Sequence, residues 1–352
     1  MTNAPVSHTL RTPALVDGHI HPDKTAWGVP WVSRRPARTL PELIANDRAL
    51  QASYETSVED RAYALLSNAL RHGTLAMRAH VDVSTHLGTA NVEGVRAAAE
   101  RLPELTVQIV AFPQFGLLTN PGTLEAMEAS LRSGADLVGG IDPGGIEGDL
   151  HRHLDTIFGL ADRASRDLDI HLHDGGEDGL AQIREIARRT IASGRQGRVT
   201  IGHAFALCDD TLPSLGSTLD LLAEAGIWIA TCALGADPVP DPDLFERHGV
   251  RLVAGSDGVR DAWSPFGNGN MIDRAHLLAY RTGAITDTEL ERAFRFASTA
   301  GGEMLGLPEL ATWSEQSSTG LEFAAHNIAE LVVERPAPLR VIRDGREISL
   351  DR

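Results

Sequence analysis

The 352-residue sequence contains a single lysine, Lys24, and no run of five or more basic side chains. Its 32 Lys and Arg residues stand against 48 Asp and Glu residues, which gives a formal net charge of −16. Nucleic-acid phosphates and anionic lipids are bound by basic surfaces. This charge balance therefore argues against nucleic acid and membrane surfaces as partners.

Cysteines and long hydrophobic runs are also scarce. Cys208 and Cys232 are far apart in the sequence, so we expect two reduced thiols and no disulfide framework. No apolar stretch approaches the roughly 18 residues of a membrane span. The first ten residues, MTNAPVSHTL, lack the basic start and apolar centre of a signal peptide. We therefore expect a cytoplasmic protein.

Short apolar segments alternate with amphipathic ones along most of the chain. Segments that are apolar on both faces are typical of buried parallel strands. The predicted strands are residues 15–21, 74–82, 105–112, 136–142, 168–173, 199–203, 226–231 and 250–257.

Amphipathic helices are predicted between these strands. Residues 57–73 begin with Ser57 as N-cap and end at Gly73, and residues 179–194 end at Gly194. Strand–helix alternation repeated eight times predicts an α/β fold with a (β/α)8 barrel. An open doubly wound sheet is the alternative, but no G-x-G-x-x-G motif follows the first strand. The long connection 22–73 is expected to cover the active site.

Histidine and aspartate residues fall at the carboxyl ends of four predicted strands. His19 and His21 end the first strand, His171 the fifth, His203 the sixth and Asp257 the eighth. In a barrel these ends share one rim, where active sites lie, and residues two apart in a strand point to the same side. Each residue alone is as easily structural, but imidazoles and a carboxylate together suit one zinc or ferrous ion with an open position for water.

These positions lie in sequence stretches that resemble the amidohydrolase superfamily, and within it the bacterial cytosine deaminase branch. The resemblance covers nearly the whole predicted barrel. The stretches that carry it are GHIHPDK (18–24), RAHVDV (78–83), VQIVAFPQ (107–114), GADLVGGID (134–142), DIHLHD (169–174), IGH (201–203), AGSD (254–257) and DAWSPFG (261–267).

The resemblance implies a metal site and its catalytic groups. It implies that His19, His21, His171 and Asp257 bind one divalent metal ion, and that His203 helps to deprotonate the attacking water. It places Asp174 where the family has a proton-shuttling Glu.

Two alternatives stay open for the proton shuttle, and one further residue is implied for substrate binding. Glu177 is the rival if Asp174 is too short, and Asp257 is also available for proton transfer. Gln114 stands where the branch reads the amide edge of its substrate. Trp263 and Phe115 are candidates for stacking on a flat heterocycle. Loop packing is the alternative for both residues, and for Trp263 it is the favoured one.

Several positions depart from the family pattern. The strand at 136–142 has no lysine to bridge two metals, so we expect one metal ion. Gly258 follows Asp257, and Phe115 follows Gln114, where the branch has acidic residues. Together with the aspartate at position 174, where the family has a glutamate, these differences argue against cytosine itself as the substrate. Strand 74–82 carries Arg78, His80 and Asp82, which are expected either to brace the rim or to form a structural ion pair within the barrel. For His173, a role behind the ligands or in barrel packing is expected rather than metal binding.

Family members also wrap both termini into a small β-sandwich beside the barrel. We predict a barrel domain at 14–305 and a reduced β appendage formed by 1–13 and 306–352. The N-terminal part of the sandwich is expected to be missing, and AELVVE and LRVIRDGREI are predicted as its last strands. Because exposed sheet edges need covering, we expect a second copy of the chain as partner, in a homo-oligomer.

These observations favour a metal-dependent hydrolytic deaminase of a small cyclic amidine, pyrimidine- or triazine-like. A bound metal lowers the pKa of water from 15.7 to about 7, and the resulting nucleophile attacks an sp² carbon. One alternative is an amidohydrolase that uses the same site to cleave a cyclic or acyclic amide or to remove an N-alkyl amine. Another is a non-catalytic metal- and ligand-binding barrel, suggested only by the aspartate at position 174.

Overall fold

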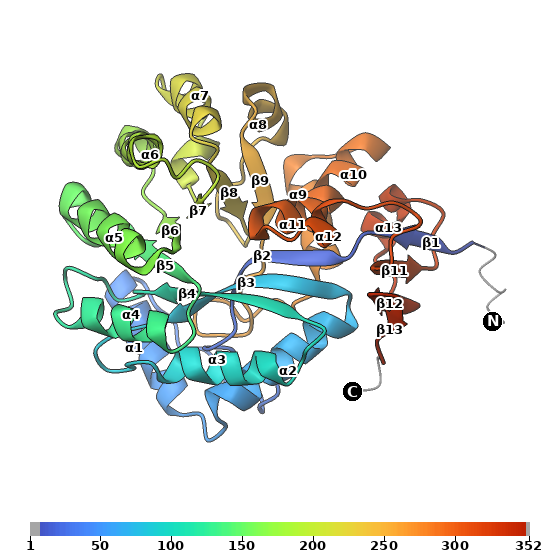
Figure 1. Ribbon diagram of the computed structural model, residues 1–352, viewed down its shortest axis with the longest axis horizontal. Helices are drawn as coiled ribbons and strands as arrows, with labels where there is room; N and C mark the ends of the chain where they lie inside the picture. Colours follow the sequence, from blue (N-terminus) through green and yellow to red (C-terminus); the bar gives the residue numbers. More distant parts are fainter. Residues whose placement is uncertain (1–7, 350–352) are drawn as a thin grey trace.

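The computed structural model describes residues 8–349 and contains two β-sheets with helices packed around the larger one (Figure 1). The larger sheet has nine parallel strands in the order β10-β2-β3-β4-β5-β6-β7-β8-β9. Its strands are β2 Leu15–His21, β3 Thr74–Asp82, β4 Thr106–Phe112, β5 Leu137–Ile141, β6 Asp167–Leu172, β7 Val199–His203, β8 Trp228–Thr231, β9 Arg251–Ala254 and β10 Asp257–Gly258.

Helices connect these strands and ring the sheet on its outside (Figure 1). This is the predicted α/β barrel of the (β/α)8 type. The helices are α1 Leu40–Ala52, α2 Val58–Arg71, α3 Ala90–Glu100, α4 Thr123–Arg132, α5 Leu150–Ala164, α6 Gly176–Ala192, the 3-10 turn η1 Phe205–Cys208, α7 Leu215–Glu224, α8 Pro242–His248, α9 Met271–Thr282, α10 Asp287–Phe296, α11 Thr299–Leu305, α12 Pro308–Ala311 and α13 Ile328–Glu334.

The eighth predicted strand is divided into β9 and β10. These two short strands pair with different neighbours and so connect the last part of the barrel sheet to the first. β9 pairs with β8, whereas β10 pairs with the first barrel strand through Asp257 and Ile20. Two glycines allow this close approach. A Cβ on Gly255 would lie 2.5 Å from the Cβ of His19, and a Cβ on Gly18 would lie 2.7 Å from a methyl group of Val253. Side chains at these glycines would push the last strand away from the first.

The barrel helices pack as their sequences predict. In α2, Ser57 accepts a hydrogen bond from the backbone N–H of Asp60, and Leu65 and Leu66 are fully buried.

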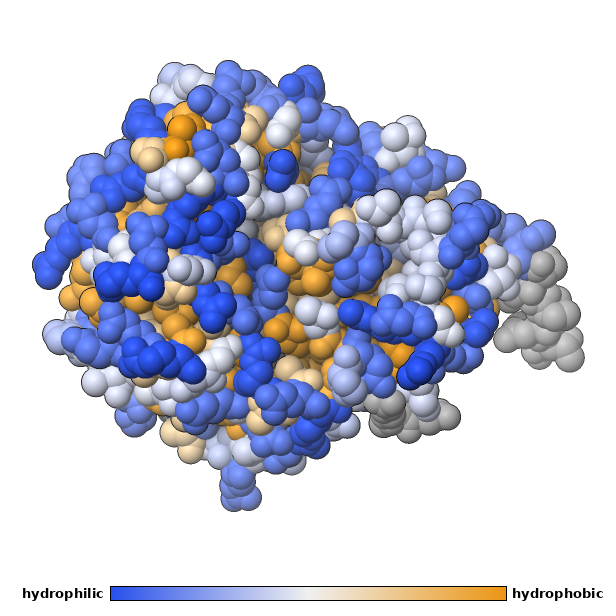
Figure 2. Space-filling view, viewed as in Figure 1, coloured by the Kyte–Doolittle hydropathy of each residue, from blue (hydrophilic) through white to orange (hydrophobic). Residues whose placement is uncertain are grey.

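Hydrophilic residues cover most of the face in Figure 2, with hydrophobic surface in separate areas. No helix in the described part of the chain combines the length and the apolar character that crossing a bilayer requires.

Arg78 of β3 has a structural role inside the barrel. Its guanidinium donates to Asp169 Oδ2 at 3.1 Å, to Thr200 Oγ1 at 2.8 Å and to Gln108 Oε1 at 3.0 Å. These partners lie on β6, β7 and β4, so one buried side chain ties four strands together. These contacts favour a structural ion pair within the barrel over bracing of the rim as the role of Arg78.

The smaller sheet corrects two expectations about the termini. Its order is β1-β11-β12-β13, formed by β1 Leu10–Thr12, β11 Gly320–Phe323, β12 Arg340–Arg343 and β13 Arg346–Glu347. The N-terminal part of the appendage is therefore present, because β1 pairs with β11 antiparallel. The predicted strands within LRVIRDGREI are confirmed.

The segment AELVVE is helical, so the prediction of a strand there was wrong. Asn327 caps α13 by accepting a hydrogen bond from the backbone N–H of Glu330. Leu331 and Val332 are buried, and adjacent buried residues fit a helix face packed against neighbouring helices rather than the alternation of a half-exposed strand. Packing against the neighbouring helices, together with this cap, outweighed the β propensity of the two valines.

Candidate active site

Four side chains from three strands meet at the carboxyl ends of the barrel strands. His21 Nε2 lies 3.3 Å from His171 Nε2 and 3.3 Å from Asp257 Oδ1. His19 Nε2 lies 3.8 Å from the same oxygen of Asp257. The parallel pairing of β10 with β2 sets Asp257 opposite Ile20, between the two histidines. These pairwise contacts bring the four residues named by the sequence resemblance close together, through His21 and Asp257.

The nitrogen atoms at this centre suit a metal ion. Both ring nitrogens of His19 and the Nδ1 atoms of His21 and His171 are buried and have no hydrogen-bond partner among residues 8–349. An unpaired buried polar group costs about 1–3 kcal/mol, so several in one place indicate a missing ligand. Burial and then His203 lower the pKa of His19 well below its usual value. The imidazole is therefore neutral, which is the form that binds metal.

Asp257 supplies the negative charge of the centre. Burial alone would raise its pKa, but the hydrogen bond with His21 and the surrounding imidazoles hold the pKa well below its usual range. Three neutral imidazoles and one carboxylate fit the donor preferences of zinc or ferrous iron.

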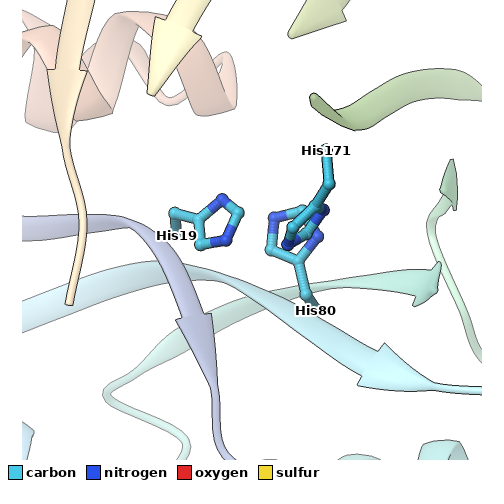
Figure 3. A group of neighbouring side chains, drawn as sticks. All are labelled: His19, His80 and His171. Atoms are coloured by element: carbon cyan, nitrogen blue, oxygen red, sulfur yellow. The ribbon is translucent and has the colours of Figure 1, made fainter. Parts of the chain in front are cut away.

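His80 of β3 also belongs to this cluster, and the sequence analysis did not assign it there. Its ring centroid lies 3.9 Å from that of His19 and 4.6 Å from that of His171. Figure 3 shows the three rings converging from different strands. Ligand atoms of these three residues lie within 4.8 Å of one another, as do those of His19, His203 and Asp257. The sequence signals for His80 were its place on a predicted barrel strand and within the stretch RAHVDV of the resemblance.

A pair formed by His173 and Asp142 stands beside the cluster. Their side chains are joined by a 2.8 Å hydrogen bond between His173 Nδ1 and Asp142 Oδ2. Burial alone would lower the pKa of His173, but Asp142 raises the pKa above its usual value. The sequence analysis left His173 as a packing residue and gave Asp142 no role, because nothing local links the ends of β5 and β6.

Backbone strain marks the same region. His203 ends β7 with φ of +67°, Asp257 has φ of +59° and Asp142 has φ of +29°. Residues other than glycine rarely adopt such backbone conformations. Each costs about 1–3 kcal/mol, and such residues cluster at active sites. Burial, and then His173, lower the pKa of His203 to about 3. His203 is therefore a neutral imidazole.

These groups line a cavity of about 260 Å³ that includes Gln114 and Trp263. Its wall has both charged groups and the apolar side chains Ile141 and Ile146. A concave site with a few converging polar groups is the usual form of a small-molecule site.

Comparison with known proteins agrees with this geometry. A family model described as "Amidohydrolase family" matches residues 48–311. The chain belongs to the amidohydrolase family. This amidohydrolase is an enzyme that hydrolyses carbon–nitrogen bonds other than peptide bonds.

Three relatives illustrate the similarity. An N-isopropylammelide isopropyl amidohydrolase from Pseudomonas sp. (strain ADP) is 33% identical, over 97% of this chain and 86% of its own length. The crystal structure of an N-isopropylammelide isopropylaminohydrolase from Burkholderia multivorans has a TM-score of 0.92 and 35% identity, covering 99% of this chain and 90% of that one. A 5-methylcytosine deaminase from Klebsiella pneumoniae, liganded with 5-fluorocytosine, has a TM-score of 0.83 and 25% identity, covering 99% and 89%.

The two proton-shuttle candidates of this amidohydrolase are engaged elsewhere. Asp174 Oδ2 accepts hydrogen bonds from the backbone N–H of Gly145 and from Gln182 Nε2, both at 2.8 Å. Glu177 Oε1 accepts a hydrogen bond from the backbone N–H of Ser214 at 3.1 Å. In these contacts both carboxylates bind loop or helix groups outside the histidine cluster.

The stacking candidates are separated in space. Trp263 lines the same cavity as Gln114. Phe115 lies at a neighbouring cavity, where the Arg48 guanidinium stands 4.3 Å from its ring centroid. Trp263 is thus placed to meet a ligand, whereas Phe115 packs against Arg48 of α1.

Lys24, the only lysine, is buried beside the cavity among aspartates. Its Nζ lies 3.3 Å from Asp82 Oδ1 and donates to Gln114 Oε1 at 2.6 Å. Burial alone would lower the pKa of Lys24, but Asp82, Asp47 and Asp23 raise it. Because an ammonium group only donates, Gln114 must present its oxygen to Lys24, and its N–H groups remain for a ligand.

We expect Lys24→Met to destabilise the protein. Removing one partner of a buried ion pair costs about 3–5 kcal/mol, because it leaves the buried carboxyl group of Asp82 without its partner. Urea unfolding followed by circular dichroism measures this loss. Arg340→Met is the matched control, since Arg340 pairs with Glu322 on the surface and its loss should change stability little. Equal unfolding free energies in the two variants would contradict the role assigned to Lys24.

Proposed function

We propose that this amidohydrolase is a mononuclear metal-dependent deaminase of a small cyclic amidine, pyrimidine- or triazine-like. The observation that carries the proposal is the set of close contacts that joins His171 to His21 and joins both His21 and His19 to Asp257. The relatives described as hydrolases of N-isopropylammelide and as a 5-methylcytosine deaminase support a nitrogen heterocycle as substrate.

One divalent ion, zinc or iron, would be held by those four residues. When bound, such an ion lowers the pKa of water to about 7 and polarises the substrate. No lysine lies on β5 to bridge a second ion, which favours a single metal.

His203 is proposed to accept the proton of the attacking water. Its ring centroid lies 5.0 Å from that of His19, and its low pKa leaves it unprotonated at neutral pH. Gln114 would donate a hydrogen bond to a substrate oxygen or ring nitrogen, and Trp263 would cover one face of the ring.

His173 is proposed to give a proton to the departing amine, held in place by Asp142. It lines the cavity, which Asp174 and Glu177 do not reach in this arrangement. A leaving amine needs such a proton because its free anion is a very poor leaving group.

Asp142→Asn is expected to lower kcat by roughly 100-fold, because a misplaced general acid loses its typical contribution. Steady-state kinetics with metal analysis checks this, and the metal content should stay unchanged. Asp220→Asn is the matched control, since Asp220 pairs with His248 outside the site at 2.7 Å. Asp174→Asn and Glu177→Gln should have smaller effects. If either exceeds Asp142→Asn with metal retained, that carboxylate is the proton shuttle instead.

The function itself is tested with metal-loaded protein and a panel of heterocycles. The panel contains N-isopropylammelide, further aminotriazines, cytosine and 5-methylcytosine, and mass spectrometry identifies the products. Release of ammonia supports deamination, whereas ring opening without loss of an amine would indicate amide hydrolysis. No turnover of any compound would overturn the proposal.

A second candidate is removal of an N-alkyl amine in place of ammonia. Two of the relatives described above, at 33% and 35% identity, are hydrolases of N-isopropylammelide. The apolar Ile141 and Ile146 in the cavity wall are compatible with an alkyl group. Detection of isopropylamine in the same assay distinguishes this candidate.

A further inference from the structure

Gly258 follows the metal-site residue Asp257 and leaves a space in the cavity wall. A Cβ built on Gly258 would lie 2.2 Å from Oδ2 of Asp261. The φ of Gly258 lies outside the left-handed region, so the backbone itself would tolerate a side chain. The carboxylate of Asp261 therefore takes the volume that a side chain at 258 would fill.

The two oxygens of Asp261 have different surroundings. Oδ1 accepts hydrogen bonds from the backbone N–H groups of Trp263, at 2.9 Å, and Ser264, at 2.8 Å. Oδ2 is buried and has no hydrogen-bond partner in the described part of the chain. One oxygen thus holds the loop, while the other is left without a donor.

Asp261 and Gly258 both belong to the wall of the cavity that contains Gln114. Buried polar groups are nearly always paired in folded proteins, so a ligand N–H is the natural partner for Oδ2. Burial raises the pKa of Asp261 to about 7, and Lys24 counteracts this effect. A donor from the ligand would further stabilise the charged carboxylate.

We propose that Asp261 determines substrate specificity by accepting a hydrogen bond through Oδ2 from a ring N–H of the heterocycle. This inference rests on the proposed function, because it places a heterocycle in this cavity. Together with the N–H groups of Gln114, Asp261 would select rings that carry both an N–H donor and an acceptor, as oxo-substituted pyrimidines and triazines do.

A purely structural role for Asp261 makes a different prediction. Asp261→Asn keeps an oxygen for the N–H groups of Trp263 and Ser264 but replaces the other oxygen with a donor. If Asp261 only holds the loop, this variant behaves as the wild type. If Asp261 reads a ring N–H, selectivity is lost.

The test compares ligands that differ by one ring methyl group. Cytosine is paired with 1-methylcytosine, and N-isopropylammelide with its ring-N-methylated derivatives. Binding to metal-loaded protein is measured by calorimetry and turnover by kcat/KM. A site built around a substrate N–H rejects analogues without it strongly, so we expect at least about 100-fold preference for an unmethylated ring in the wild type. We expect less than about 10-fold in Asp261→Asn.

Two further variants test whether the Asp261 carboxylate determines selectivity because it occupies the volume that a side chain at position 258 would fill. Gly258→Ala should displace Asp261 and lower selectivity as Asp261→Asn does. Gly258→Asp combined with Asp261→Ala should recover selectivity relative to Asp261→Ala alone. Asp241→Asn is the control, because Asp241 also accepts a backbone N–H two residues ahead, that of Asp243, but lies outside this cavity.

The outcomes separate this inference from the proposed function. Turnover with equal selectivity in wild type and Asp261→Asn overturns the role of Asp261 and leaves the deaminase proposal standing. Binding selectivity that depends on Asp261, without turnover, supports the role and overturns the deaminase proposal. Binding of neither member of any pair overturns the inference.

Discussion

Asp257→Asn is expected to remove the metal ion and to lower kcat/KM by roughly 1,000-fold, because a catalytic metal supplies several kcal/mol of transition-state stabilisation. Asparagine tolerates left-handed backbone, so the φ of +59° at this position is kept and the change is confined to the ligand. Elemental analysis and steady-state kinetics on the same preparation measure both effects. Chelation of the wild type should reproduce the loss, and zinc or ferrous iron should reverse it.

His80 makes this experiment sharper, since it lies as close to His19 as the proposed ligands do. If His19, His21, His171 and Asp257 are the ligands, His80→Asn should retain one metal ion per chain. Loss of metal in His80→Asn, with retention in Asp257→Asn, would move the metal to the group formed by His19, His80 and His171. Asp209→Asn, on the surface beside Thr211, controls for the loss of a carboxylate.

His203→Asn is expected to lower kcat by roughly 100- to 10,000-fold, the usual range for a general acid–base group, with the metal content unchanged. Asparagine again suits the φ of +67° at this position. The variant therefore removes the proton acceptor without forcing the strand end to move. Kinetics normalised to bound metal measures the effect.

The control for this variant is His248→Asn, which removes a histidine paired with Asp220 far from the cluster. If His203→Asn loses its metal, His203 is a ligand with His19 and Asp257, as their close ligand atoms also allow. If kcat stays within about threefold of wild type, neither role holds.

The barrel was predictable because its strands are local features. Each of the eight predicted strands matches an observed strand or, for 250–257, the pair β9 and β10. The division of that last strand was not predictable, because it depends on Gly255 passing within contact of His19, more than two hundred residues earlier. The segment AELVVE forms a helix instead of the predicted strand for a related reason. Its two valines favour a strand, but the packing surface offered by neighbouring helices decided the outcome.

The sequence by itself determined which residue types stand at the strand ends, since a period of two and a repeated strand–helix unit place His19, His21, His171, His203 and Asp257 on one rim. The tertiary structure alone decided which side chains meet there. Three features depend on how the strands are staggered and on the paths of the loops. They are the position of His80 in the histidine cluster, the hydrogen bond between His173 and Asp142, and the contact of Lys24 with Gln114. These are set by packing between segments distant in sequence, and no local pattern encodes them.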